Sequence, residues 1–285
     1  MAKNNAQKAS TGHIGEEGNV TATAGAVPMQ VYVIENGRMY DMPDSMMYQG
    51  GNDSLIEIPL YSVLIRHPDG NVLFDSGQND DPKRQDDVTL QHLSLPDSQK
   101  YPLALQRLGL EPADIDYLVL SHLHSDHMGY ADLFTNAKVF IAAKEFEGTL
   151  KELGAGTAPS AKDIECLLNS NLQWQLVPEN VETLEILKGL TLYNFGAGHN
   201  HGMIGLLIEL PQTGNILLPS DACCYLENLG TPPLLPPKRV FDYGLALATL
   251  EKIKGIAKAK NAQVWPAHDP EWFKTITKST EGFYE

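Results

Sequence analysis

Three histidines and one aspartate occupy six consecutive positions of this sequence. The segment His122-Leu123-His124-Ser125-Asp126-His127 follows the apolar run 117–120, with Ser121 between them. Imidazoles and a carboxylate at the end of a buried strand cost desolvation free energy unless a partner uses them, and divalent metals bind both groups. The first two histidines can face the same way in an extended segment, whereas Asp126 and His127 follow a bend. The spacing therefore indicates two adjacent metal sites.

Three further apolar runs end in residues that can bind a metal. His199 follows the run 190–195, Asp221 follows the run 216–218, and His268 follows the run 263–265. Loops at strand ends are where α/β folds build sites, because rigid strands position the loops. We therefore expect seven ligands to gather at one place, namely His122, His124, Asp126, His127, His199, Asp221 and His268. We interpret His13, His67, His92 and His201 as surface or structural residues.

The elements that must carry these loops are short strands with helices between them. A first strand-like run opens at Val31, Val33 and Ile34, and further strands are predicted at 59–67, 72–74, 117–120, 139–142, 190–195, 204–210, 215–218 and 263–265. Helices are predicted at 101–110, 111–114, 143–153 and 244–260. The Gly- and Ala-rich segment 154–159 is predicted to connect the two halves of the chain. This pattern predicts a layered α/β fold, with sheet on sheet inside and helices outside.

The composition describes an acidic globular chain of 285 residues, 42% of them hydrophobic and 20% charged. The formal net charge of -15 repels phosphate backbones and anionic lipids, and no apolar stretch approaches the ~20 residues that cross a bilayer. We therefore expect a small uncharged substrate, with neither nucleic acid nor a membrane as partner. The three cysteines, Cys166, Cys223 and Cys224, form no disulfide framework and predict a cytoplasmic location.

Residues 1–28 lack the pattern of a secretory signal and are predicted to be a disordered tail, with residues 29–285 forming a single domain.

The motif His-x-His-x-Asp-His, followed in order by His199, Asp221 and His268, resembles that of the metallo-β-lactamase superfamily, and the resemblance runs from about residue 31 to the C-terminal region. It implies a four-layer αββα sandwich with a dinuclear site at one edge of the sheets. By this resemblance, the first metal is held by His122, His124 and His199, the second by Asp126, His127 and His268, and Asp221 bridges both. Asp75, in a segment that resembles the family's Asp-x-Gly element, is expected to steady the ligands.

Within the superfamily, segments 101–103 and 108–116 look most like those of the N-acyl-homoserine lactone hydrolases, which open a lactone ring. Those enzymes carry a tyrosine three residues after the bridging aspartate, where this chain has Cys224, followed by Tyr225. One position reverses the facing of a side chain in a strand. Either a local bulge brings Tyr225 into the site, or the enzyme works without that hydroxyl.

The expected function is zinc-dependent opening of a lactone ring, in an N-acyl-homoserine lactone or a similar small lactone. Two Zn²⁺ ions, with Mn, Fe or Co also compatible with the ligands, would share a water and lower its pKa toward ~7, giving a hydroxide that attacks the carbonyl carbon. Asp126 is expected to move a proton to the leaving alkoxide, and Tyr225 is the second catalytic candidate.

Two alternatives share the fold. A thioesterase of the glyoxalase II kind, or another carboxylic-ester hydrolase, shares the ligand set, but the basic residues that would clamp a charged glutathione moiety are few beyond Lys238 and Arg239. A di-iron redox protein usually needs a carboxylate where this chain has His124.

The methionine-rich segment 39–47 has two interpretations, a lid over the substrate or a core or subunit contact. The adjacent Cys223 and Cys224 are interpreted as small apolar residues near the core rather than a redox pair. A homodimer is left open.

Overall fold

The computed structural model of the chain describes residues 28–52 and 54–285. The predicted disordered tail lies outside the described residues except for Pro28. Single-domain organisation of residues 29–285 stays a prediction.

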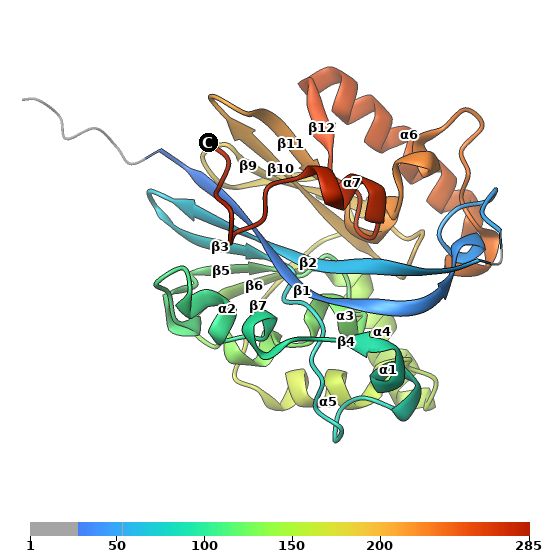
Figure 1. Cartoon of the computed structure of the whole chain (residues 1–285), viewed down its shortest axis with the longest axis horizontal. Helices are drawn as coiled ribbons and strands as arrows, with labels where there is room; N and C mark the ends of the chain where they lie inside the picture. The colour runs from blue at the N-terminus through green and yellow to red at the C-terminus, as the bar shows by residue number, and fades with distance from the viewer. Residues whose placement is uncertain (1–27, 53) are drawn as a thin grey trace, which may run out of the picture.

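Two mixed β-sheets lie face to face at the centre of the molecule (Figure 1). The first sheet has the strand order β4-β1-β2-β3-β5-β6-β7. Its strands are β1 (Gln30–Pro43), β2 (Leu55–His67), β3 (Gly70–Phe74), β4 (Leu93–Ser94), β5 (Tyr117–Val119), β6 (Lys138–Ala142) and β7 (Gln173–Val177). The second sheet has the order β12-β11-β10-β9-β8. Its strands are β8 (Thr183–Leu187), β9 (Leu190–Gly196), β10 (Met203–Leu210), β11 (Gly214–Leu218) and β12 (Ala262–Val264).

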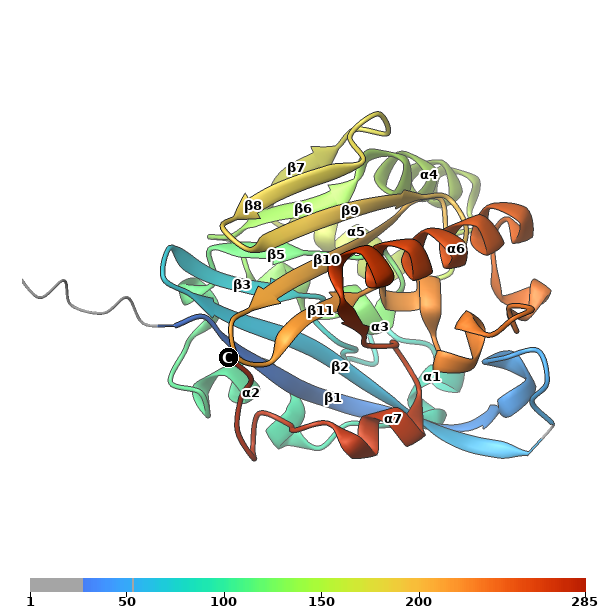
Figure 2. The same cartoon turned by 90° about the horizontal axis from the view of Figure 1, so that it is seen from above.

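The helices lie outside the two sheets. They are α1 (Asp87–His92), α2 (Leu103–Gln106), α3 (Ser125–Met128), α4 (Ala143–Ala155), α5 (Ala161–Asn169), α6 (Tyr243–Lys260) and α7 (Pro270–Thr275). Figure 1 shows α4 and α5 beyond the first sheet, and Figure 2 shows α6 crossing over the second sheet. The predicted four-layer αββα sandwich is confirmed. Among the described residues, no helix combines the length and apolar character needed to cross a membrane.

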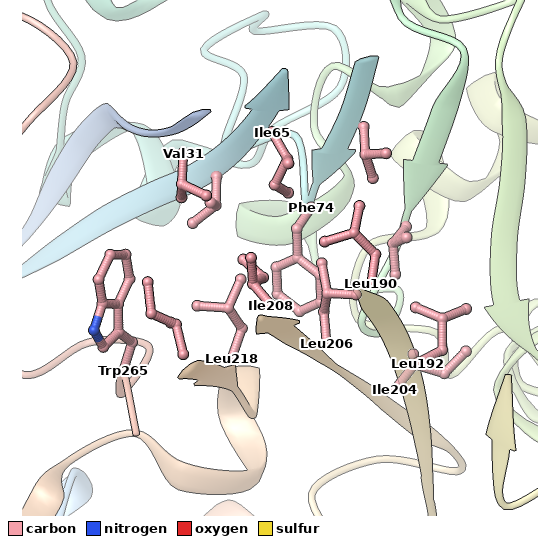
Figure 3. Close-up of a cluster of buried hydrophobic side chains, with 14 of the residues drawn as sticks. Val31, Ile65, Phe74, Leu190, Leu192, Ile204, Leu206, Ile208, Leu218 and Trp265 are labelled. Atoms are coloured by element: carbon pink, nitrogen blue, oxygen red, sulfur yellow. The ribbon is translucent and has the colours of Figure 1, made fainter. Parts of the chain in front are cut away.

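The main core fills the space between the sheets. Side chains of Val31, Ile65 and Phe74 from the first sheet face Leu206, Ile208 and Leu218 from the second (Figure 3). Along a strand, successive side chains point to opposite faces. Leu207 and Leu217 therefore turn outward, where they pack with Leu250 and Ile253 of α6. Strands buried on both faces explain why their sequences read as continuous apolar runs.

The predicted connection between the two halves of the chain is wrong. Segment 154–159 links α4 to α5, and β7 still belongs to the first sheet. The chain enters the second sheet only between Val177 and Thr183. Segment 154–159 instead contains the end of a helix. Gly156 adopts φ 72° just after α4, a left-handed conformation that glycine tolerates. In this conformation the chain satisfies the last carbonyls of the helix.

The predicted helix 101–110 is also shorter in the structure, where α2 covers only Leu103–Gln106. The residues after it close into a turn, with Leu108 N bonded to Leu105 O and Gly109 at φ 70°. The predicted strands and the other three helical segments are present, with ends that differ by one or two residues at most positions. The predicted set lacks seven of the strands and α-helices among the described residues, namely β4, β7, β8, α1, α3, α5 and α7.

The loops that carry the predicted ligands begin at the carboxyl ends of the strands. In the first sheet β3 and β5 are parallel neighbours, so Asp75 and the segment 121–127 emerge side by side. In the second sheet β11 is parallel to β12, and β9 points the same way because both β9 and β11 are antiparallel to β10. Strand direction therefore brings His199, Asp221 and His268 to one edge.

Candidate metal centre

The structure brings all seven predicted ligands together in two adjacent groups. One group contains His122, His124, His199 and Asp221, the other contains Asp126, His127 and His268, and within each group the ligand atoms lie within 4.8 Å of one another. We call them the first and the second group.

Asp221 lies between the two groups. Its Oδ2 is 3.3 Å from His199 Nε2 in the first group. Its Oδ1 is 2.9 Å from His268 Nε2 and 3.2 Å from His127 Nε2 in the second. One carboxylate thus presents one oxygen to each group, which is the arrangement of a bridging ligand.

Three imidazole nitrogens converge in the first group. His124 Nδ1 lies 2.9 Å from His122 Nε2 and 3.2 Å from His199 Nε2. Burial lowers the pKa of His122 well below its ordinary value and lowers the pKa of His199 to about 3. These rings are therefore neutral at physiological pH, the form in which imidazole binds a metal.

Charges alternate in the second group. Asp126 Oδ2 lies 3.4 Å from His127 Nε2 and 3.5 Å from His268 Nε2. Burial alone would lower the pKa of His127, but the carboxylates of Asp126, Asp221 and Asp75 raise it well above its ordinary value. Burial alone would raise the pKa of Asp126, yet the two imidazoles lower it. Without another cation, protons on the imidazoles would balance the clustered carboxylates.

The residues fit divalent cations on both sides of Asp221. Among the described residues, His127 Nε2 and Asp221 Oδ1 are buried and have no hydrogen-bond partner of suitable geometry. Buried polar atoms without a partner are costly, and nitrogen and oxygen donors aimed at a common point are what a divalent metal requires.

Contacts behind the ligands orient three of the rings. His127 Nδ1 lies 2.8 Å from Asp75 Oδ2, His268 Nδ1 lies 3.1 Å from the Pro59 carbonyl oxygen, and His122 Nδ1 lies 3.0 Å from Ser121 Oγ. Holding one ring nitrogen in this way leaves Nε2 directed at the centre.

Asp75 ties several of these loops together. It accepts hydrogen bonds from Ser121 N at 2.8 Å and Ser121 Oγ at 2.9 Å, besides its contact with His127. Ser220 Oγ also donates to it, at 3.4 Å. Its backbone adopts φ 58°, a conformation uncommon outside glycine, in which Asp is among the more tolerant residues. The placement agrees with the supporting role that the family resemblance implies.

The sequence pattern does not point to Ser121, Ser220 or Pro59 as site residues. Ser121 and Ser220 each directly precede a ligand in the chain, which is a weak signal that could have found them. The Pro59 contribution comes from a backbone carbonyl, about which a residue type says nothing.

Tyr225 and Cys224 are not on a strand. Residues Ser220–Cys223 form a 3₁₀ turn, Cys224 is helical and Tyr225 is extended. The alternation that underlies the predicted bulge therefore does not apply. The Tyr225 ring stacks on Tyr48 with centroids 5.9 Å apart, and its hydroxyl is buried with no hydrogen-bond partner among the described residues. Cys224 Sγ lies 3.7 Å from the Asp221 carbonyl oxygen.

The methionine-rich segment packs behind Tyr225. Met47 is buried with Ile58, Cys224 and Tyr225, and Met39 and Met42 pack against this cluster. The packing favours the interpretation of the segment as core. Cys223 and Cys224 are both buried free thiols, which agrees with their interpretation as small apolar residues near the core.

His201 lies outside both groups, as expected. Its Nε2 is 2.9 Å from a Glu152 carboxylate oxygen and its ring packs on Phe241. Burial lowers the pKa of His124 and of His199, and the positive charge of Arg239 lowers both further. The segment after Arg239 is bonded to the His199 loop, with Phe241 N donating to His199 O at 3.1 Å.

Comparisons with known proteins agree with this fold and site. The family model described as Metallo-beta-lactamase superfamily matches residues 57–268. The chain is 34% identical over 241 residues to the N-acyl homoserine lactonase AiiB of Agrobacterium fabrum, covering 81% of this chain and 87% of the relative. It is 27% identical over 267 residues to the N-acyl homoserine lactonase AttM of Azorhizobium caulinodans, covering 90% and 99%.

Solved structures show the same relationship. A variant of AiiA from B. thuringiensis with N-decanoyl-L-homoserine at its active site superposes with a TM-score of 0.76 at 25% identity, covering 90% of this chain and 99% of that one. An N-acyl homoserine lactone hydrolase with its product N-hexanoyl-L-homoserine at the catalytic metal centre gives the same values. The chain therefore belongs to the metallo-β-lactamase superfamily and, within it, to the N-acyl homoserine lactonase branch.

Proposed function

We propose that this protein is a zinc-dependent lactonase that opens the ring of N-acyl-homoserine lactones. The observation that carries the proposal is the position of Asp221 between two groups of ligands, in a chain 34% identical to a lactonase. The acidic net charge of -15 supports a small uncharged substrate over an anionic one. The free cysteines support a reducing, cytoplasmic setting.

His122, His124, His199 and Asp221 would hold one cation, and Asp126, His127, His268 and Asp221 the other. We propose zinc as the metal, because imidazoles and carboxylates are ligands that zinc binds well. Mn, Fe and Co also accept this ligand set. When bound, the pair of cations supplies Lewis acidity that polarises an ester carbonyl and makes water nucleophilic near neutral pH.

Asp126 is the proposed proton carrier. Its side chain is 24% exposed, whereas the side chain of His127 beside it is 5% exposed. The neighbouring imidazoles lower its pKa, so its carboxylate is ionised and can accept a proton. Asp126 would take this proton from the attacking water. It would then pass the proton to the alkoxide that leaves when the ring opens.

Tyr225 stays the second catalytic candidate. A buried hydroxyl without a partner calls for an explanation, and we propose that the substrate supplies the missing partner of the Tyr225 hydroxyl.

The test is a pH-indicator screen of purified protein against N-acyl-homoserine lactones of increasing acyl length, with thioesters and phosphodiesters as controls. We expect proton release only with lactones, loss of activity after chelation, and recovery on adding about two equivalents of zinc per chain. Faster turnover of glutathione thioesters would replace the proposal with a thioesterase. Activity that survives complete removal of metal would refute it.

A further inference from the structure

Glu145 is a buried carboxylate beside the metal centre that belongs to neither group of ligands. It lies in the first turn of α4 and is 0% exposed. One oxygen, Oε1, accepts hydrogen bonds from Leu123 N at 2.8 Å and from Asn200 Nδ2 at 2.9 Å. The other, Oε2, accepts from Gly202 N at 3.0 Å. All three bonds of the carboxylate thus go to two loops of the site.

The two loops carry the three imidazoles of the first group. Leu123 lies between His122 and His124, in the loop after β5 of the first sheet. Asn200 and Gly202 follow His199, in the loop after β9 of the second sheet. The Glu145 carboxylate is therefore a direct link between ligand loops that come from different sheets.

Close packing of α4 against the His199 loop fixes the position of this carboxylate. A Cβ added at Gly202 would lie 2.9 Å from Glu145 N, and one added at Gly148 would lie 2.2 Å from His201 Cγ. One turn further along, Glu152 pairs with His201 Nε2 at 2.9 Å. The helix thus packs against the loop over about two turns.

A charged carboxylate at the buried position of Glu145 is unfavourable for folding. Burial raises the pKa of Glu145 to about 7, although its bonds to Leu123 and Gly202 act in the opposite direction. A neutral side chain would avoid that cost, so the carboxylate calls for a reason beyond packing.

We propose that Glu145 is a positioning residue, which fixes the spacing between the His122–His124 pair and His199 and thereby sets the affinity of the first group for its metal. This inference rests on the ligand assignment of the proposed function. Glu145 is not one of the predicted ligands, and it acts through its three contacts to the two loops, namely Leu123 N, Gly202 N and the Asn200 side chain.

The decisive variant is Glu145→Gln, which keeps the length of the side chain. Its carboxamide presents N–H groups where one carboxylate oxygen accepts a hydrogen bond, so at least one of the three bonds is lost. Supporting contacts of this kind typically change metal affinity by about 10- to 100-fold. We expect a loss of that size in the first group alone.

Two parent variants, His268→Ala and His199→Ala, serve as backgrounds in which zinc binding to each group is measured separately. In His268→Ala the second group has lost a ligand, so the tightest zinc reports on the first group, and in His199→Ala the tightest zinc reports on the second. Zinc affinity is measured at pH 8, where the Glu145 carboxylate is ionised, by competition with a chromophoric chelator. Glu145→Gln is expected to weaken zinc by at least about 10-fold in the His268→Ala background and by less than about 3-fold in the His199→Ala background.

Asp163 offers a matched control. It is also buried, at 1% exposed, and its carboxylate accepts from Asn79, Arg84 and Gln85, outside both ligand loops. Asp163→Asn is expected to lower the Tm without the selective loss of zinc. Amide hydrogen exchange of the zinc-free protein adds a direct readout, since Glu145→Gln should speed exchange at Leu123 or at Gly202, whichever faces the amide nitrogen, and Asp163→Asn should speed neither.

Equal zinc affinities in Glu145→Gln and its parent, or equal weakening in both backgrounds, would overturn the inference and leave Glu145 a packing residue. Wild-type protein that binds no zinc would overturn the proposed function and this inference together. If Glu145→Gln does not fold, Asn200→Ala removes one of the three bonds and is expected to weaken the first group in the same direction. Unchanged zinc affinity in Asn200→Ala would then count as refutation.

Discussion

Asp75 Oδ2 lies 2.8 Å from Nδ1 of His127, and the same carboxylate binds the backbone and hydroxyl of Ser121. The contact turns His127 Nε2 toward Asp221. A residue 52 positions away in the chain thus decides how a ligand of the second group is oriented.

Asp75→Asn should weaken zinc in the second group by about 10- to 100-fold, because the amide no longer supplies two acceptor oxygens to Ser121 and His127. Metal content after dialysis and proton release from a lactone would both fall. Asp116→Asn is the control, since that exposed carboxylate accepts a hydrogen bond from Asn71 N at the start of β3. An Asp75→Asn protein that keeps two zinc ions and full activity would contradict this role.

Asp221→Ala should abolish ring opening, because it removes the one carboxylate that faces both groups. His124→Ala should also abolish ring opening, because it removes the Nδ1 atom that lies close to both His122 Nε2 and His199 Nε2 in the first group. The measurement is proton release in weak buffer, with zinc content determined on the same samples. We expect Asp221→Ala to lose metal from both groups and His124→Ala to retain more of the second. Substantial lactonase activity in Asp221→Ala would argue against the bridging assignment.

Cys224→Ser and Tyr225→Phe test which side chain the reaction uses. Cys224→Ser should keep most activity, because the thiol is buried and burial raises its pKa well above the ordinary value, which disfavours the thiolate. Tyr225→Phe should lower kcat/KM by up to about 10-fold, because the substrate loses the hydrogen bond that we propose for the Tyr225 hydroxyl. Steady-state kinetics on one lactone decides both. Full activity in Tyr225→Phe would remove Tyr225 from the mechanism, and an inactive Cys224→Ser would show that Cys224 is more than a packing residue.

Glu145 should make the stability of the zinc-free protein depend on pH. Burial raises its pKa from 4.5 to about 7, so the folded state binds this proton more tightly than the unfolded state. The favourable contribution is complete below about pH 4.5, and it declines as pH rises to about 7. Urea unfolding from pH 4.5 to 8 should therefore show wild type losing stability relative to Glu145→Gln as pH rises. A difference that is constant with pH would mean that the pKa of Glu145 is not raised.

Much of the fold follows from local patterns. The hairpin of β2 and β3 is marked by alternating apolar residues around Asp69-Gly70-Asn71, and α6 by apolar residues at three and four. Among the elements missing from the predicted set, β7 and β8 are five residues long and largely exposed, so their short alternation of polar and apolar residues is a weak signal of a strand. Segment 154–159 misled for a related reason, since a glycine that ends a helix and one that separates two halves of a chain look alike in sequence.

The sequence by itself determined which residues could bind metals, because imidazoles and carboxylates at strand ends are chemically suited to that role whatever surrounds them. The family resemblance implied that Asp221 bridges two metals and that Asp75 steadies the ligands. Only the tertiary structure decided which atoms make those contacts, that Glu145 links loops from different sheets, and that Tyr225 stacks on Tyr48. Residue type and spacing set what a side chain can do, but its partners depend on backbone turns and on contacts between the two sheets. Those contacts join residues that no local pattern relates.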